Sequence, residues 1–222
     1  MFIGHYAVGF AAKRAAPKTS LGLLIGSTVL LDLLWPIFLL LGWEEVRVVR
    51  GATPFLNLDF VSYPISHSLA TTIGWAVLAG GLYWTVTRNR AGAIWIAIGV
   101  ASHWVLDFVS HRPDLPMWPG GPKVGLGLWN STFQTVAVEE AMLALGLWIY
   151  VVHTSARDPI GRWGFLGFLL FTLAIYAASI ASPPPPSARA VAWVGLSSWI
   201  MPLWAGWFDR HRRFVPDLSS TA

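Results

Sequence analysis

The sequence predicts an all-α protein that crosses a membrane several times, and three of its features support this fold class. Charged residues make up only 12% of the 222 residues, and hydrophobic residues make up 55%. Soluble domains carry about 25% charged residues, so a water-soluble fold of this size could not cover its surface. In addition, apolar stretches recur at close to the 20 or so residues that a helix needs to cross about 30 Å of hydrocarbon.

The apolar stretches predict about six membrane-spanning helices in a single domain covering residues 1–222. A shorter apolar segment from Phe2 to Ala12 precedes them and is followed by Lys13 and Arg14. It is too short to span, so it would form a short helix that lies in the interface or enters the membrane part-way. The six predicted spans lie at about 20–41, 67–87, 92–109, 134–152, 162–181 and 189–208.

The basic residues predict the orientation of these spans. If six spans alternate in direction, 10 of the 15 lysines and arginines lie on the side of the N-terminus and five on the opposite side. Cytoplasmic loops carry the excess of positive charge, so both termini are expected in the cytoplasm. The net charge of +4 then reflects membrane topology, and no nucleic-acid partner is expected. The absence of cysteine excludes disulfides and thiolate metal ligands.

Ionisable residues inside the predicted spans mark a candidate functional site, because each costs about 2.5–3.5 kcal/mol to insert. Asp32 and His103 lie at nearly the same depth, roughly 18 Å from the inner end of their spans at 1.5 Å per residue. The outer connections, at about 42–66 and 110–133, are the long ones, and long ordered loops often carry function. The candidate residues converge on the outer half of the membrane and comprise Asp32, His67, His103, Asp107, His111, Glu139 and Glu140.

The spacing of His103 and Asp107 favours metal binding. Residues four apart share one helix face, so an imidazole nitrogen and a carboxylate oxygen can bind one cation at about 2.0–2.2 Å, the range for zinc. His111 adds another step of four on roughly the same face. Each residue taken alone also fits a hydrogen-bonded packing role, but one shared cation explains several buried ionisable groups together. We therefore expect a divalent ion, zinc first, with manganese or magnesium as alternatives.

Several motifs extend this pattern along residues 1–155, leaving 156–222 for two accessory spans and a basic tail. They are Tyr-Pro-Ile-Ser-His-Ser-Leu at 63–69, Ser-His-Trp-Val-Leu-Asp at 102–107, His-Arg-Pro-Asp-Leu-Pro at 111–116 and Val-Gly-Leu-Gly-Leu-Trp-Asn-Ser at 124–131. With His5 and Asp32, these motifs resemble the membrane-bound metal-dependent hydrolases, a family that includes the LexA-binding inner-membrane hydrolases.

The order Asp, His, His-x-x-x-Asp is also similar to one zinc site of the zinc-dependent phospholipase C and nuclease group. That resemblance implies Asp32, His67, His103 and Asp107 as ligands of one metal, with His5 near a second. The chain also departs from these patterns. It has a single acid in the first span, Ser62-Tyr63-Pro64 before His67 where family members have His-Arg-Gly, and Thr135 rather than histidine four residues before Glu139. One metal is therefore expected.

These features predict a metal-dependent hydrolase of the inner membrane that acts on a phosphoester or lipid-like substrate. A metal lowers the pKa of its bound water to about 7, which makes the water a nucleophile at neutral pH. Glu139 is the expected proton acceptor or donor, with Asp114 as the second candidate. Arg112, Lys123 and Asn130 are the expected contacts to an anionic substrate.

Two other functions remain open on the sequence. The ionisable residues could form the cation or proton path of a transporter, although the inner half looks dry and no inverted repeat is evident. Alternatively, the protein could be a scaffold in which a structural metal fastens the helices together. The sequence leaves the oligomeric state open.

Overall fold

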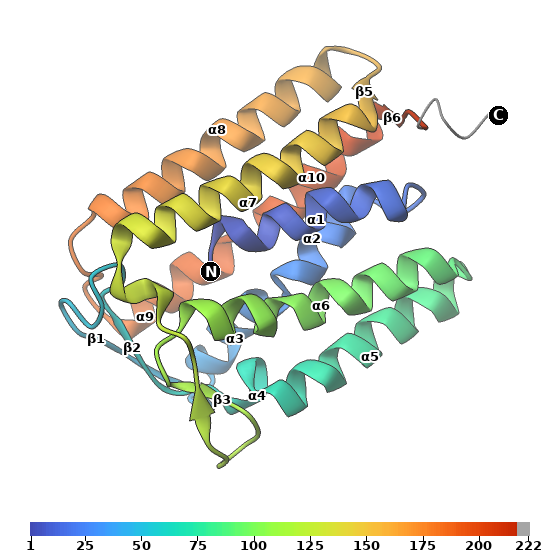
Figure 1. The fold of residues 1–222 in the computed structure, drawn as a ribbon. Coiled ribbons are helices and arrows are strands. Elements are labelled where there is room, and N and C mark those ends of the chain that lie inside the picture. Colours follow the sequence, from blue (N-terminus) through green and yellow to red (C-terminus); the bar gives the residue numbers. More distant parts are fainter. Residues whose placement is uncertain (217–222) are drawn as a thin grey trace.

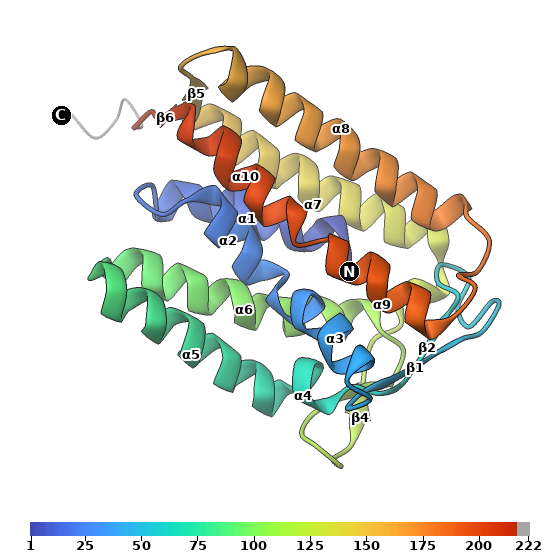
Figure 2. The ribbon, with the colours of Figure 1, turned by 180° about the vertical axis from the view of Figure 1, so that it is seen from behind.

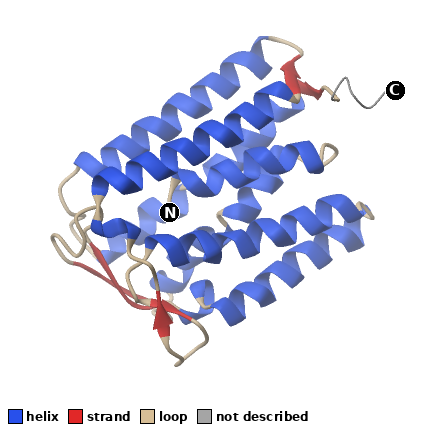
Figure 3. Ribbon diagram, in the orientation of Figure 1, coloured by secondary structure: helices blue, strands red, loops and turns tan. Residues whose placement is uncertain are grey.

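The structure, a computed structural model, describes residues 1–216, most of which are helical. Figure 1 shows long helices packed side by side, with the connecting loops gathered at the two ends of the bundle. The strands form short two-stranded pairs at those ends, as Figure 3 shows. This arrangement confirms the predicted helical membrane fold.

Four helices among residues 1–216 are each long and apolar enough to cross a membrane. A serine, asparagine or aspartate side chain caps the first turn of each by accepting a backbone N–H, which satisfies donors that a helix start leaves unpaired. These helices correspond to the second to fifth predicted spans and are α5 (Leu69–Thr87), α6 (Arg90–Ser110), α7 (Thr132–Val152) and α8 (Pro159–Ala181).

The first predicted span is a broken helix. It forms α2 (Leu21–Thr28) and α3 (Leu30–Leu40), which meet at an angle of 58°. Val29 leaves the helical conformation between them, with φ −113° and ψ 14°. The break ends α2 early and leaves backbone carbonyls of its last turn available to other partners. Counted as one span, this pair brings the number of candidate spans in the described chain to five.

The sixth predicted span, 189–208, is also divided. It forms α9 (Ala188–Ser197) and α10 (Ile200–Arg210), each too short to cross the hydrocarbon alone. The six-span count and the cytoplasmic position of both termini therefore stay predictions.

The short apolar segment at the start forms α1 (Ile3–Ala15), which lies at the centre of the bundle against α7, α2 and α6. Glycines permit this close packing. A Cβ atom at Gly146 would lie 2.4 Å from the carbonyl oxygen of Ala7, and one at Gly9 would lie 2.8 Å from Ile25. Figure 1 places the N-terminus midway along the bundle, as expected of a helix that enters part-way.

The remaining elements lie at the ends of the bundle. At one end, β5 (Thr154–Ala156) pairs antiparallel with β6 (Arg212–Phe214). The two long connections occupy the opposite end, where the antiparallel pairs β1–β2 and β3–β4 form (Figure 1). Their elements are β1 (Glu45–Val48), β2 (Leu58–Ser62), α4 (Pro64–His67), β3 (Leu115–Pro116), β4 (Lys123–Val124) and the 3₁₀ helix η1 (Leu128–Asn130).

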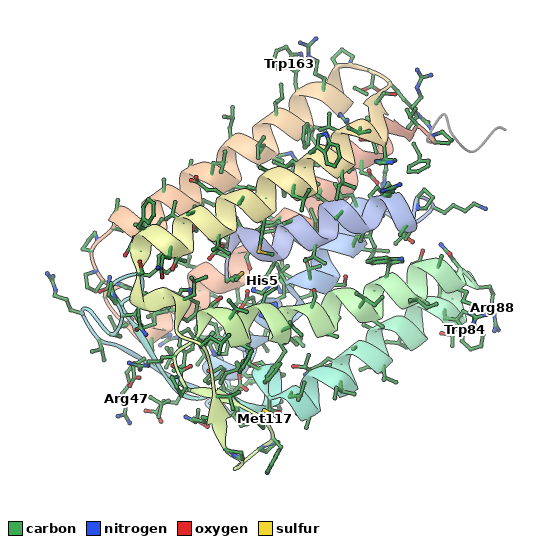
Figure 4. All side chains as sticks on the ribbon, viewed as in Figure 1. His5, Arg47, Trp84, Arg88, Met117 and Trp163 are labelled. Atoms are coloured by element: carbon green, nitrogen blue, oxygen red, sulfur yellow. The ribbon has the colours of Figure 1, made fainter. Side chains whose placement is uncertain are left out.

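Exposed tryptophans occur near both ends of the spanning helices. Trp84 lies close to the end of α5 and Trp163 close to the start of α8, and Figure 4 shows both on the outside of the bundle. Trp43 and Trp118 are exposed in the long connections at the opposite end. Tryptophan is enriched at the two membrane–water interfaces, so these positions are consistent with a bundle that spans the bilayer.

Candidate metal centre

Three histidines and two aspartates from α3, α4, α6 and the residue that follows α6 converge in the half of the bundle nearer the long connections. The breaks in the helices help to place them, because Asp32 follows the α2–α3 break and His67 lies at the end of the short helix α4. His5 lies beside them, and Figure 4 shows it in the middle of the bundle. The five converging residues are Asp32, His67, His103, Asp107 and His111.

The Nε2 atoms of the three histidines face the two carboxylates. His67 Nε2 lies 3.4 Å from Asp32 Oδ1 and 3.8 Å from Asp107 Oδ2. His103 Nε2 lies 3.7 Å and 3.1 Å from the same two oxygens. His111 Nε2 lies 3.8 Å from Asp107 Oδ2. Ligand atoms of Asp32, His67 and His103 all lie within 4.8 Å of one another, so this group could hold a metal ion.

A second group of side chains with the same spacing shares His103. It consists of His5, His103 and Asp107. The imidazole ring of His5 stacks on that of His103 with the centroids 3.9 Å apart, and His5 Nε2 lies 3.2 Å from Asp107 Oδ1. The ammonium group of Met1 donates to the same oxygen at 2.5 Å. Oδ1 of Asp107 is therefore engaged with α1, whereas Oδ2 faces the other three histidines.

The α2–α3 break orients His103. The carbonyl of Thr28, the last residue of α2, accepts a hydrogen bond from His103 Nδ1 at 2.8 Å. A carbonyl can only accept, so Nδ1 carries the proton and Nε2 keeps its lone pair. His103 Nε2 is buried and has no hydrogen-bond partner in the described chain. Its lone pair is thus directed at Asp32 and Asp107.

A buried carboxylate orients His67 through a serine. Glu44, 5% exposed, accepts hydrogen bonds from the backbone of Ile65 and Ser66 at 2.8 Å, and from Ser66 Oγ at 2.6 Å. Because Ser66 Oγ uses its proton on Glu44, it accepts from His67 Nδ1, 2.7 Å away. His67 Nε2 is therefore also left with its lone pair facing the cluster.

Asp114 orients His111 in the same way. Its Oδ1 lies 2.8 Å from His111 Nδ1 and also accepts from the hydroxyl of Tyr63 at 3.0 Å. Its Oδ2 accepts from Arg112 Nε at 3.1 Å. Burial alone would raise the pKa of Asp114, but the hydrogen bonds from His111, Arg112 and Tyr63 hold it below its usual value. The carboxylate stays charged and fixes the ring of His111.

The chemistry of this donor set fits a divalent cation. Each of the three rings has its Nδ1 held by an oxygen and its Nε2 directed at carboxylates, which are themselves acceptors. Acceptors that face one another in a buried site repel unless a cation or proton lies between them. Outer partners that fix the ring and tautomer in this way are typical of metal-binding histidines. Nitrogen and oxygen ligands without sulfur suit zinc, manganese or magnesium.

Replacement of Glu44 tests the role of this orienting network. In Glu44→Gln an amide keeps the shape of the side chain but presents an NH₂ group that cannot accept from Ser66. We expect metal affinity to fall about 10–100-fold, the usual effect of removing an outer partner, with the fold retained. The measurement is a metal titration of purified protein. Glu45→Gln is the matched control, because Glu45 is exposed and pairs with Arg47; equal affinities in the two variants would contradict the prediction.

The other predicted site residues have different surroundings. Glu139 Oε2 accepts from the backbone of Phe2 and Gly4 at 2.7 Å and 3.1 Å, so it caps the start of α1, while Oε1 is buried without a partner in the described chain. Arg112 is held by Asp59 and Asp114. Lys123 is exposed and donates to the carbonyl of Val61 at 2.9 Å, and Asn130 is the exposed last residue of η1.

Three residues that orient the histidines were not predicted from the sequence, namely Thr28, Glu44 and Ser66. Ser66 precedes His67 directly and its hydroxyl was a usable signal. Glu44 lies 22 residues before Ser66, at the other end of the same long connection, so no helical or strand period links them. Only the folded chain brings these residues to the histidines.

Fold and cluster together define an integral membrane protein whose buried histidines and carboxylates could hold a metal ion. The sequence model of the YdjM inner membrane proteins matches residues 56–183, more than half of the chain. The chain therefore belongs to the YdjM inner membrane protein family and is integral to the inner membrane. The matched segment includes His67, His103, Asp107 and His111. No curated protein and no solved structure matches the chain significantly.

Proposed function

We propose that this protein is a membrane-embedded, metal-dependent hydrolase with one divalent ion, zinc first, at Asp32, His67, His103 and Asp107. The observation that supports it best is the convergence of three oriented Nε2 atoms on two carboxylates. His103 has a single free lone pair, since its Nδ1 proton is given to Thr28. The two groups of side chains that share His103 therefore favour one ion over two. His111 and His5 are its nearest additional ligands.

The exposure of Asp32 favours a catalytic ion over a structural one. Structural zinc sites are closed by four protein ligands, whereas catalytic sites keep a position for water or substrate. The side chain of Asp32 is 42% exposed, while those of His67, His103 and Asp107 are buried. The cluster therefore has an accessible side at Asp32, which a purely structural ion would not need.

The core below the cluster disfavours the transport alternative. Phe10, Leu21 and Ile25 are fully or almost fully buried together in the main apolar core. A cation or proton path would need polar groups that continue from the cluster to the buried pair of Lys13 and Asp209 near the end that carries β5 and β6. These three apolar side chains instead lie on α1 and α2 between the cluster and that pair.

The residues of the chain have separate roles in the proposed reaction. A divalent ion in this cluster supplies a bound water of pKa about 7. Glu139 has one buried oxygen without a hydrogen-bond partner, Oε1, which makes it the candidate proton acceptor. Asp114 positions His111 rather than contacting the substrate. Arg112 and Lys123 remain the candidates for holding a phosphoester or lipid-like anion.

The decisive experiment measures metal content and hydrolysis together on protein purified in mild detergent. We expect cleavage of a phosphodiester or phospholipid that stops when a chelator removes the metal and returns when zinc is added. Glu139→Gln should keep the metal and lower kcat about 10²–10⁴-fold, the usual contribution of a general acid–base group. Glu140→Gln is the matched control, because Glu140 is the adjacent, exposed carboxylate.

Two results would count against the proposal. Bound metal without hydrolysis of any phosphoester or lipid would favour the scaffold. No bound metal, even after divalent cations are added, would assign the buried groups to packing or transport.

A further inference from the structure

A deep apolar groove of about 910 Å³ opens on the face of the bundle opposite the view of Figure 1. Figure 2 shows this face, where α2 and α3 lie between α10 on one side and α5 and α6 on the other. The broken helix α2–α3 forms the floor of the groove, and α5 and α10 form its walls. It does not include any of the residues of the metal centre.

Close packing of small residues brings α10 against α2 on one side of the groove, whereas its other side stays open. Gly22 allows α10 to approach α2, since a Cβ atom there would lie 2.3 Å from the carbonyl oxygen of Pro202. On the other side α5 packs against α6 instead of α10. Leu23 of the central helix α2 is therefore 51% exposed, an unusual position for an apolar residue between two other helices.

The charged group of the groove and most of its hydroxyl groups lie at one end. That end carries the hydroxyl groups of Ser20, Tyr83 and Thr87 together with Arg210, the only charged residue in the lining. Arg210 is exposed, and its side chain has no ion pair or hydrogen bond within residues 1–216. Its neighbour Asp209 is engaged elsewhere, with Lys13. The rest of the lining is apolar except for Ser27 and Trp199, whose polar groups donate to backbone carbonyls of Leu24 and Leu33. The groove is therefore complementary to an amphiphile with an anionic head.

The length of the groove matches one leaflet of a membrane. The wall formed by α10 runs from Ile200 to Arg210, 11 residues, which is about 16 Å of helix. Half of a hydrocarbon core of about 30 Å is about 15 Å. A ligand with its charge at Arg210 would thus extend its apolar part to the middle of the bilayer, where Trp199 and Leu33 close the groove.

We propose that this groove binds one phospholipid, with an acyl chain between α5 and α10 and its phosphate on Arg210. A guanidinium group matches the geometry of a phosphate and stays charged at any pH the membrane meets. Basic pockets between spanning helices are known to bind the head groups of anionic lipids. A transmembrane helix of a partner protein is the alternative occupant of the groove. Such a helix would cross both leaflets and needs no cation at one end, so the groove fits it less well than a phospholipid. The bound lipid would pack against α3, because Leu30 and Leu33, which precede and follow Asp32 in the chain, line the groove.

The test is the lipid content of the full chain purified in mild detergent, measured by native mass spectrometry and by phosphorus analysis. Wild-type protein should retain about one phospholipid per chain after washing that removes other lipids. Arg210→Gln should lower this occupancy about tenfold or more, the loss expected for one charge-assisted hydrogen bond. Leu203→Trp should lower it too, because Leu203 is 71% exposed on the wall and a larger ring would fill the groove.

Arg213→Gln is the matched control, since Arg213 is a basic residue near the same end of the chain but bonds to Ser155 outside the groove. Its lipid occupancy should equal that of the wild type. Equal occupancy in the Arg210 and Arg213 variants would show only non-specific lipid and overturn the proposal. A dimer without lipid would overturn it as well, because a second copy would then cover the groove. Metal content is measured on the same samples, so a failure of the lipid proposal can be distinguished from a failure of the proposed hydrolase function.

Discussion

His103→Ala is expected to lower metal content from about one ion per chain to none that can be detected. The variant loses the Nε2 lone pair that lies 3.1 Å from Asp107 and 3.7 Å from Asp32, and both candidate ligand groups include this residue. No other histidine can replace it, because His5 and His67 are held on its two sides by α1 and α4. The loss should exceed the 10–100-fold effect of an outer partner such as Glu44.

Elemental analysis of wild type and variant side by side is the measurement, with a thermal unfolding curve for each. His211→Ala is the control, because His211 lies outside the cluster and pairs with Asp158. Removal of the His103 ring also leaves the Thr28 carbonyl without this hydrogen bond, so the variant could lose stability. Asp107→Ala, which leaves that hydrogen bond in place, then serves as the second test. Metal retained in both variants would sink the ligand assignment.

Asp209→Ala is expected to destabilise the bundle by about 3–5 kcal/mol, the range for removing one partner of a buried ion pair. Asp209 Oδ2 accepts from Lys13 Nζ at 2.7 Å and from the backbone of Leu21 at 3.0 Å, and its Oδ1 accepts from the hydroxyl of Tyr150 at 3.0 Å. One carboxylate at the end of α10 therefore links α1, α2 and α7. Without it the ammonium group of Lys13 stays buried and unpaired.

The free energy of unfolding in mixed micelles measures this effect. Arg47→Gln is the control, since it breaks the exposed pair with Glu45, and exposed pairs contribute little. The double variant Lys13→Met, Asp209→Leu should recover much of the loss, because apolar residues of similar volume often replace a buried pair without penalty. A loss below about 1 kcal/mol in Asp209→Ala would show that the pair does not hold the bundle together.

The same ion pair bears on the predicted division of the chain into a metal-site half and an accessory half, which stays a prediction. The two predicted spans within residues 156–222 carry no ionisable group between Arg162 and Arg189 or between Arg189 and Asp209, so this part looked accessory to the metal-site half. In the structure, α10 packs against α2, and Asp209 joins it to α1. The last helices are thus part of the frame that holds the elements carrying Asp32 and His5.

Properties that depend on neighbours in the chain could be predicted from the sequence. Length and apolar composition identified α5, α6, α7 and α8 as spans, because crossing a bilayer imposes both on any helix. The helical period placed His103 and Asp107 on one face of α6, with His111 directly after the helix, since residues four apart share a helix face. Asp32 and His103 were predicted to lie at one depth in the membrane, because the rise per residue of a helix is constant. This shared depth predicted the cluster.

The tertiary structure decided everything that joins distant parts of the chain. The break at Val29 presents the Thr28 carbonyl to His103, 75 residues away, and Glu44 reaches His67 only through a hairpin and a short helix. α1 is too short to span and yet lies at the centre, because glycines on α7 and on α1 itself admit it. These contacts depend on loop paths and on small residues facing one another, which no local pattern encodes. Residue types and depths therefore came from the sequence, whereas the orientation of each imidazole ring came from the packed bundle.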